Sequence, residues 1–232
     1  MFKQKARMSK RLLAGLIDWS MCLLLAFGLF FYPANAIFSK VFHADELKAD
    51  NYNLMLEYKI IYIDENGEYQ YTEAGKDESN EVYEAYHNDE KYKSLKNTEY
   101  LLTLTELGSS LIVSETLLFL IMPLILRNGQ TIGKKINRII LTDDCYIKVK
   151  FLNVFLRYLT ILFIESIASL FTYGVPLILT FIIMCITKDH RTVHDYLSAT
   201  RVIEKGMTVF LNPADRLEFD ESNAINEVDL TK

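Results

Sequence analysis

The sequence predicts an all-α membrane protein with about four transmembrane helices and a small mixed α/β extracytoplasmic insertion. Half of its 232 residues are hydrophobic, and the mean hydropathy is +0.11 although a long polar stretch lies inside the chain. The hydrophobic residues gather in runs long enough to cross a bilayer. Basic segments flank these runs, as is typical of topology signals. The composition excludes a disordered chain, and the uneven spread of hydrophobic residues argues against an ordinary soluble globule.

The first hydrophobic run, residues 12–31, contains one charged residue, Asp18. At about 1.5 Å per residue it extends about 30 Å, the thickness of a bilayer core. A cleaved signal peptide is the alternative, because the start is basic and Ala34-Asn35-Ala36 resembles a cleavage site. However, the run exceeds the usual length of about 7–15 residues and contains an acid. We therefore interpret residues 1–39 as a cytoplasmic basic start and a first transmembrane helix.

Two further hydrophobic stretches predict the rest of the bundle. Residues 107–126 form the predicted second transmembrane helix, with Glu115 near its middle. Residues 151–187 are too long for one span and contain the turn signal Tyr173-Gly174-Val175-Pro176, so they predict a helical hairpin. Arg157 and Glu165 make the first half of this hairpin amphipathic. This leaves open whether residues 151–170 span the bilayer or lie partly in the interface.

The distribution of basic residues predicts the orientation of the helices. Residues 1–11 hold five basic residues and no acid, and residues 127–150 hold six basic residues and two acids. Four more basic residues lie in residues 188–205. The positive-inside rule therefore predicts a multi-pass protein of the plasma membrane with four spans, both termini cytoplasmic and 127–150 as a basic cytoplasmic loop. The alternative is three spans with an interfacial segment at 151–165, which would leave the C-terminus outside.

The extracytoplasmic insertion, residues 40–106, is acidic but not of low complexity. Residues 40–105 contain 15 acids and 7 lysines. Asn66-Gly67 lies between the β-prone segments 58–63 and 69–72, which predicts a β-hairpin. Residues 81–100 then predict a helix. We interpret the insertion as a small solvated cap; the alternative is an acidic surface for a cation or a basic partner.

Few features of the chain predict catalysis or metal binding. The three cysteines, Cys22, Cys145 and Cys185, are too scattered for a disulfide framework, and they lack the spacing of a zinc site. His190 and His194 could lie on one helix face, but no third ligand follows at a known spacing. No pair of nucleophile and base stands out. We expect a non-enzymatic protein with no cofactor, no metal and no nucleic-acid partner.

Four ionisable residues lie inside the hydrophobic runs, namely Asp18, Glu115, Arg157 and Glu165. A lone carboxylate in hydrocarbon is costly, so it needs a partner, water or a proton. Asp18 is therefore either part of an ion or proton pathway or a structural partner of Arg157, with Arg11 snorkelling to the interface as a third reading. The position of Glu115 near the middle of its hydrophobic run predicts that it forms a buried polar network with Arg157 and Glu165. Four helices are few for a pore, so transport would favour an oligomer.

The loop Asn128-Gly129-Gln130-Thr131-Ile132-Gly133-Lys134-Lys135 superficially suggests a phosphate-binding loop. It lacks the spacing of a P-loop and the Lys-Ser or Lys-Thr pair of that motif. Because the loop is basic and is expected beside the inner leaflet, we predict contacts with anionic lipid head groups at the cytoplasmic face of the lipid bilayer.

Together these segments resemble the RDD family of small membrane proteins, named for one Arg and two Asp. Arg11 and Asp18 match the opening motif in the first helix. The inner loop matches the Gly-Gln-Thr-x-Gly-Lys segment of the family through Gly129, Gln130, Thr131, Gly133 and Lys134. Leu156-Arg157 is similar to its Leu-Arg pair, and His194-Asp195-Tyr196 is similar to its closing segment, which makes Asp195 the second Asp. The resemblance covers roughly residues 7–39 and 107–203.

The chain also departs from the family pattern in three places. Asn137-Arg138-Ile139-Ile140 stands where the family usually continues with a Gly and a basic-Val pair. The insertion at 40–106 is longer than the usual loop. The acidic tail after Lys205, which ends the predicted cytoplasmic C-terminal segment 188–232, lies outside the resemblance.

The resemblance implies the architecture more firmly than the activity. Some members of the family look like cation–proton exchangers, and others appear beside unrelated membrane systems. One hypothesis is a carrier, or carrier subunit, for small cations or protons, with a candidate path through Arg11, Asp18, Glu115, Arg157, Glu165 and Asp195. The second is a membrane scaffold or accessory protein that binds a partner through its insertion or its cytoplasmic loops. A homo-oligomer or a membrane-protein partner is compatible with both.

Overall fold

The computed structural model describes residues 5–77, 80–126 and 128–220 of the chain. The beginning of the predicted basic start (residues 1–4), Arg127 and the end of the predicted acidic tail (residues 221–232) lie outside the described residues, as do residues 78–79. The chain divides into two compact units, which are described separately. Unit 1 comprises Met1–Leu25 and Ile112–Lys232, and unit 2 comprises Ala26–Leu111.

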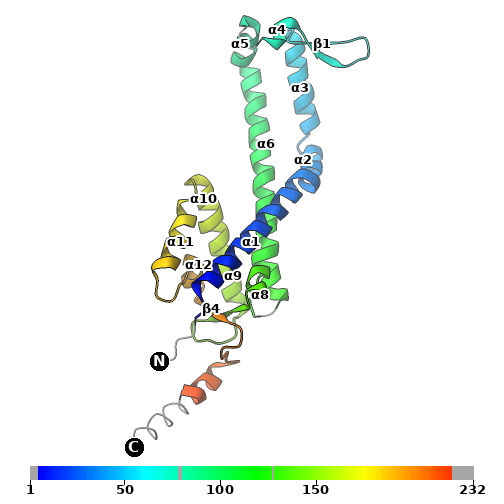
Figure 1. Cartoon of the computed structure of the whole chain (residues 1–232). Helices are drawn as coiled ribbons and strands as arrows, with labels where there is room; N and C mark the ends of the chain where they lie inside the picture. The colour runs from blue at the N-terminus through cyan, green and yellow to red at the C-terminus, as the bar shows by residue number, and fades with distance from the viewer. Residues whose placement is uncertain (1–4, 78–79, 127, 221–232) are drawn as a thin grey trace, which may run out of the picture. The chain divides into compact units, whose positions relative to one another are not determined.

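The hydrophobic runs are carried by three long helices (Figure 1). The first, Met8–Val41, consists of α1 (Met8–Leu29), a π-helical segment η1 (Phe30–Ala34) and α2 (Asn35–Val41). The second, Glu90–Ile125, consists of α6 (Glu90–Glu115), η2 (Thr116–Ile121) and α7 (Met122–Ile125). The third, Phe151–Phe171, consists of α9 (Phe151–Thr160), η3 (Ile161–Ile167) and α10 (Ala168–Phe171).

These helices bear out the predicted helical membrane protein. Within the described residues, three helices are long and apolar enough to cross a membrane. A fourth apolar helix, α11 (Val175–Ile186), is shorter and follows the turn predicted at Tyr173-Gly174. Gly174 adopts a left-handed backbone with φ +85°, which explains why a glycine stands at this turn.

The helix predicted over residues 81–100 is wrong in its extent. The structure has α5 (Glu81–Asn88) and then a break at Asp89, after which α6 begins at Glu90 and continues into the second hydrophobic run. Asn80 caps α5, because its Oδ1 accepts a hydrogen bond from the backbone N–H of Val82 at 3.0 Å. The Oδ1 of Asp89 accepts from the backbone N–H of Lys91 at 2.6 Å. These two caps start separate helices where the charge pattern suggests one.

Unit 2 contains the predicted β-hairpin. Strands β1 (Ile61–Ile63) and β2 (Tyr69–Tyr71) pair antiparallel, with Tyr62 opposite Gln70. Gly67 supplies the left-handed turn at φ +82°, and the side chain of Asp64 accepts from the backbone N–H of Asn66 at 2.9 Å. The neighbouring helices are α3 (Ala44–Glu57) and α4 (Glu73–Lys76). A small core holds these elements together, formed by Leu54, Met55, Ile60, Ile61 and Tyr86.

Unit 1 contains a second sheet that the sequence analysis does not predict. Strand β3 (Ile139–Asp143) pairs antiparallel with β4 (Thr200–Glu204), with Leu141 opposite Val202. The backbone N–H of Ala6 donates to the carbonyl of Val202 at 3.1 Å. The segment before α1, the basic loop and the segment after α11 therefore meet at one sheet. Two short helices, α8 (Ile132–Ile136) and α12 (Val193–Leu197), precede the two strands.

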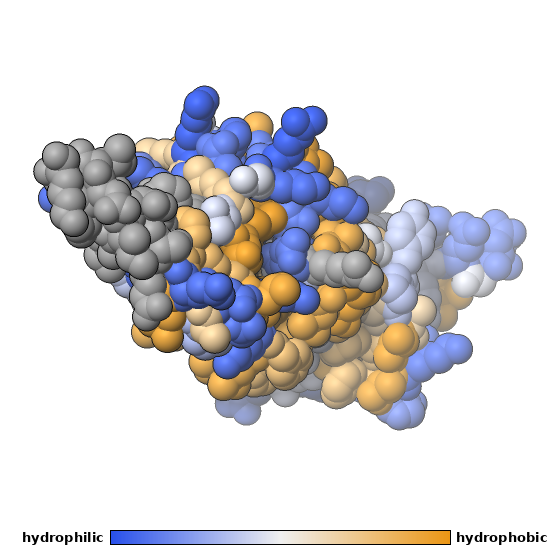
Figure 2. Space-filling model, turned by 90° about the horizontal axis from the view of Figure 1, so that it is seen from below, coloured by the Kyte–Doolittle hydropathy of each residue, from blue (hydrophilic) through white to orange (hydrophobic). Residues whose placement is uncertain are grey.

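The sheet end of unit 1 combines polar and apolar surface. Seen from below, hydrophilic residues gather there beside hydrophobic ones (Figure 2). Lys135, Arg138, Lys148 and Lys150 are exposed in this part of the chain. The sheet itself is buried, and Ile139, Leu141, Val202 and Ile203 are nearly inaccessible to solvent.

The sheet core yields a first prediction, for the variant Ile203→Ala. Ile203 is 0% exposed. Removing its side chain leaves a cavity, which we expect to lower the free energy of unfolding by about 2–5 kcal/mol. Thermal unfolding of the detergent-solubilised protein would measure the change. The control is Ile136→Ala, because Ile136 is 61% exposed and its removal opens no cavity. Equal stability of the two variants would contradict the role given to this sheet.

Candidate functional site

The centre of the candidate site is a carboxylate shared by two arginines. Asp195 in α12 is fully buried, and its two oxygens pair with the guanidinium groups of Arg11 in α1 and Arg157 in α9. Arg157 also donates to the hydroxyl of Thr200 at 3.2 Å. Burial alone would raise the pKa of Asp195, but Arg157 and Arg11 hold this pKa well below its usual range. The carboxyl is therefore charged and serves as the common counter-ion of two helices.

The short helix α12 positions this carboxylate. Thr192 precedes the helix, and its backbone N–H donates to Asp195 Oδ2 at 3.2 Å. The side chain of Arg191 ties α12 to β4, because its Nη2 donates to the carbonyl of Asp195 at 3.2 Å and to that of Thr200 at 3.0 Å. The same guanidinium lies 2.7 Å from Asp144 and 4.4 Å from the centre of the Tyr196 ring. Asp195 is thus fixed by backbone as well as by charge.

Asp18 does not pair with Arg157 or Arg11 in the described structure, so the structural pairing with Arg157 considered for it is wrong. Its Oδ2 accepts a hydrogen bond from the hydroxyl of Thr131 at 2.5 Å. Its Oδ1 accepts from the backbone N–H of Gly133 at 2.7 Å. The carboxylate of Asp18 in α1 thereby holds the start of α8 in place. We call these two hydrogen bonds, from Thr131 and Gly133 to Asp18, the inner-loop clamp. Arg11 is likewise buried beside Asp195 and does not snorkel.

The other residues of the inner-loop motif explain why this clamp fits. A Cβ on Gly133 would lie 2.2 Å from the carbonyl oxygen of Ala14, so only glycine lets α8 approach α1 this closely. Gly129 has φ +61° and would also place a Cβ 2.8 Å from Leu141. Gln130 donates to the carbonyl of Ile139 at 2.8 Å, which ties the loop to β3. The motif is therefore a packing element between the first helix and the sheet.

A second polar group joins η3 to α12. Glu165 is 2% exposed, and its Oε1 lies 2.6 Å from Nδ1 of His194. The hydroxyl of Thr180 in α11 donates to the same oxygen at 3.2 Å. His194 in turn lies beside Asp195, with 3.9 Å between Nε2 and Oδ1. Burial lowers the pKa of His194, and the nearby Glu165 opposes this shift. Arg157 and Glu165, predicted in one network, are connected through the pair His194–Asp195.

Glu115 lies in a separate place from Arg157. It is 0% exposed, and the hydroxyl of Ser166 donates to its Oε1 at 2.5 Å. Among the described residues, its buried Oε2 has no hydrogen-bond partner. The predicted network of Glu115, Arg157 and Glu165 is therefore split into two groups. Glu115 contacts Ser166, whereas Glu165, which precedes Ser166 in the sequence, contacts His194. Glu115 thus contacts the residue that follows Glu165, and Glu165 itself contacts α12.

π-helical backbone accompanies both carboxyls. Segment η2 begins at Thr116, directly after Glu115, and η3 contains both Glu165 and Ser166. The hydroxyl of Thr116 contacts the hydroxyl of Tyr158 at 2.7 Å, which links the two helices. Single π-turns inside α-helices occur frequently at functional sites, because the wider turn re-aims side chains.

A cavity of about 710 Å³ in unit 1 adjoins these groups. Its charged end is formed by residues from five elements: Arg11 and Asp18 of α1, Lys134 of α8, Arg157 of α9, Glu165 of η3 and His194 of α12. Leu16, Trp19, Leu177 and Phe181 are among the apolar residues that line the remainder. Burial and the nearby Arg157 lower the pKa of Lys134 to about 7. Lys134 therefore lies buried at the cavity and not on an exposed loop, where the contact with head groups was expected.

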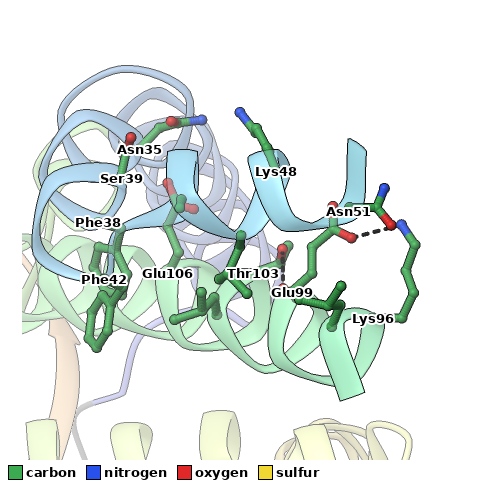
Figure 3. A pocket seen from close by; sticks show the side chains of 14 residues that line it. Asn35, Phe38, Ser39, Phe42, Lys48, Asn51, Lys96, Glu99, Thr103 and Glu106 are labelled. Carbon is green, nitrogen blue, oxygen red and sulfur yellow. Dashed lines mark hydrogen bonds and ion pairs between the residues drawn. The ribbon is translucent and has the colours of Figure 1, made fainter. Parts of the chain in front are cut away.

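Unit 2 has a smaller and more polar cavity, of about 180 Å³, between α2, α3 and α6 (Figure 3). Lys96 and Glu99 form an ion pair of 2.7 Å at its edge. Glu106 also lines it, and among the described residues its Oε1 has no hydrogen-bond partner. None of the residues predicted for the site lies in this cavity.

Sequence reasoning missed several residues of the site, among them Ser166, Thr180, Arg191 and Thr200. Hydroxyl residues in hydrophobic helices carry no strong signal, because they often bond their own backbone. Two signals were available. The spacing Thr192-x-x-Asp195 resembles a capping box and would have marked the start of α12. The β-branched residues in 139–142 and 200–203 favour strands.

Comparison with known proteins gives one match. The family model described as "RDD family" matches residues 5–199. No curated protein matches, and no solved structure matches. The matched range includes both arginines of the shared ion pair, the whole inner-loop motif and Asp195.

The shared ion pair yields a prediction for Asp195→Asn. The substitution removes one charge and leaves two buried guanidinium groups without a counter-ion. We expect the free energy of unfolding to fall by about 3–5 kcal/mol. Thermal unfolding in detergent at neutral pH would measure this loss. The control is Asp189→Asn, because Asp189 is partly exposed and lies 3.4 Å from Arg201, so its loss should cost about 1 kcal/mol or less.

The inner-loop clamp yields a prediction for Gly133→Ala. The added methyl group collides with the backbone of α1, so we expect a loss of about 1–3 kcal/mol in stability. Gly108→Ala is the matched control, because nothing lies within 4 Å of a Cβ at that helical position. That control should be neutral or stabilising by up to about 1 kcal/mol. If the two alanine variants unfold at the same temperature, the clamp is not close-packed as described.

Proposed function

This chain belongs to the RDD family of membrane proteins, and from this premise we propose that it is a non-enzymatic carrier, or a subunit of a carrier, for protons or small cations. The observation that carries the proposal is the contact of 2.6 Å between Glu165 and His194 at the wall of the cavity in unit 1. A carboxyl and an imidazole in hydrogen-bond contact can exchange a proton. Ionisable residues inside membrane helices commonly mark ion or proton pathways.

The proposal includes four spans with both termini in the cytoplasm of a cell bounded by its plasma membrane. The contact of Ala6 with Val202 and the pairing of β3 with β4 support it. Segments that share a sheet lie on the same side of a membrane, so residues 144–199 would cross it an even number of times. The helix Phe151–Phe171 is long enough for one crossing. At about 1.5 Å per residue α11 extends about 18 Å, so its crossing would be short.

The available carboxyl oxygens support a role for Glu115 and Glu165 in transport. The charge of a carboxylate is costly in hydrocarbon, so a group with few partners takes up a proton or a cation. Glu115 receives its hydrogen bond from Ser166, and the adjacent Glu165 faces His194. A proton or cation released from Glu115 would therefore have Glu165 as its next acceptor, and the reverse. His194 would connect this pair to the cavity, which it lines.

Asp18 and Asp195 are assigned a structural part in this proposal. Asp195 is occupied by two guanidinium groups, and each oxygen of Asp18 accepts a hydrogen bond from the inner loop. Groups engaged in this way bind a transported ion only by giving up their partners. We therefore assign the transport role to Glu115, Glu165 and His194, and not to the two aspartates of the family motif.

The second candidate function is a membrane scaffold or accessory protein. The structural engagement of Asp18 and Asp195 favours it, because much of the buried charge then serves to lock the bundle. In that case a homo-oligomer or another membrane protein would bind through unit 2 or through the exposed loops. Exposed basic residues near the sheet, including Lys135 and Lys148, would contact anionic lipid head groups under either function.

A flux measurement tests the carrier against the scaffold. The full chain is reconstituted into vesicles that contain a pH-sensitive dye, and a proton gradient is imposed with Na⁺, K⁺ or neither outside. We expect proton movement that depends on one of the cations and that is abolished in Glu165→Gln, because a glutamine cannot carry the proton. Glu73→Gln is the control, since the Glu73 side chain is 94% exposed. A folded parent protein without flux under all three conditions would contradict the carrier and favour the scaffold.

A further inference from the structure

The cavity of unit 1 has two chemically different parts. One end contains the buried charged residues described above, and the remainder is lined by apolar side chains of α1, η3 and α11, such as Leu16, Ile161 and Phe181. Its volume of about 710 Å³ lies within the range of about 300–1,000 Å³ that is typical of ligand pockets. A molecule that fills it must be apolar along most of its length and polar at one end.

The apolar part of the cavity borders on lipid. Leu16 is 66% exposed, Leu23 is 47% exposed and Phe181 is 51% exposed. These side chains lie on hydrophobic helices of a membrane protein, where exposed apolar surface faces the acyl chains of the bilayer. A hydrocarbon chain can therefore reach the cavity sideways from the bilayer without crossing polar surface.

The charged end of the cavity has one cation that remains available. Lys134 is 9% exposed and lines the cavity. In the part of the chain that the structure describes, its ammonium group has no hydrogen-bond or ion-pair partner, whereas Arg11 and Arg157 share Asp195. The carboxylate of Asp18 is engaged by Thr131 and Gly133. A buried ammonium group without a partner is costly, and an anion that enters the cavity would remove this cost.

The electrostatics of Lys134 agree with this geometry. Burial and the nearby Arg157 lower its pKa to about 7, although Asp18 and Asp195 oppose the shift. An anionic group placed beside Nζ would raise this pKa and hold the lysine in its charged form. The site therefore responds to an anion by strengthening its own positive charge.

From these observations we propose that the cavity is a binding site for one anionic phospholipid of the surrounding bilayer. The phosphate of the lipid pairs with Nζ of Lys134, and one acyl chain lies along the apolar wall formed by α1 and α11. The apolar wall favours a lipid over a water-soluble anion, and the unpaired ammonium favours an anionic over a zwitterionic lipid. The lipid would occupy the cavity that Glu165 and His194 also line, but its binding does not require that the protein transport protons or cations.

The test measures lipid binding by the purified full chain. Native mass spectrometry of the delipidated protein in detergent follows the addition of phosphatidylglycerol, phosphatidylcholine or glycerol 3-phosphate. We expect one tightly bound phosphatidylglycerol, and affinity lower by about tenfold or more for phosphatidylcholine and for glycerol 3-phosphate. Equal binding of the two lipids would overturn the role of charge. Equal binding of glycerol 3-phosphate would overturn the role of the apolar wall.

Two variants locate the bound lipid. Lys134→Gln should weaken phosphatidylglycerol binding about tenfold or more, whereas Lys135→Gln, which alters the exposed neighbouring lysine, should leave it unchanged. Gly15→Leu adds volume to the cavity wall from α1 and leaves residue 134 a lysine, and nothing lies within 4 Å of a Cβ at Gly15. It should also weaken binding, and it decides the question if Lys134→Gln does not fold. Unchanged lipid binding in a folded Lys134→Gln or Gly15→Leu protein would overturn the proposal.

Discussion

One carboxylate, that of Asp195, joins three parts of unit 1 that are distant in sequence. Arg11 reaches it from α1 and Arg157 from α9, while α12 presents it from between α11 and β4. Taking these charges out of water costs several kcal/mol for each ion, and only their mutual contact and further hydrogen bonds offset that cost. Small displacements of these three side chains would therefore lose the contacts that offset the cost of burial. The ion pair fixes α12 against α1 and α9, and Arg157 extends it to Thr200 at the start of β4.

The buried acids of unit 1 differ in how much of their bonding capacity is used. Both oxygens of Asp18 and of Asp195 have partners of fixed protonation, and these contacts hold helices and loop together. Glu115 retains an oxygen without a partner among the described residues, and Glu165 faces a titratable imidazole. Asp18 and Asp195 give rigidity, and the others can change their protonation or their ligand. The π-helical turns η2 and η3 lie at the second kind of acid, where a helix departs from regular geometry to direct a side chain.

The features that were predictable from the sequence are those encoded locally. Hydrophobic runs predicted the long helices, Asn66-Gly67 predicted the hairpin, and the placement of Asp18 and Glu115 in apolar runs predicted that both are buried. Partners were harder to predict. Charge alone suggested Arg157 for Asp18, but the structure supplies a hydroxyl and a backbone N–H from the loop, and a backbone donor leaves no mark in the sequence. The β3–β4 sheet joins strands about sixty residues apart, beyond the reach of periodicity.

The sequence separation within the shared ion pair has a consequence for biosynthesis. Arg11 and Asp195 are 184 residues apart. At about 5–20 residues per second, translation leaves the first helix without its counter-ion for on the order of ten to forty seconds. During that interval the guanidinium of Arg11 must remain hydrated at the edge of the bilayer. The shared ion pair can therefore form only after α12 has left the ribosome, so this part of unit 1 is completed late in synthesis.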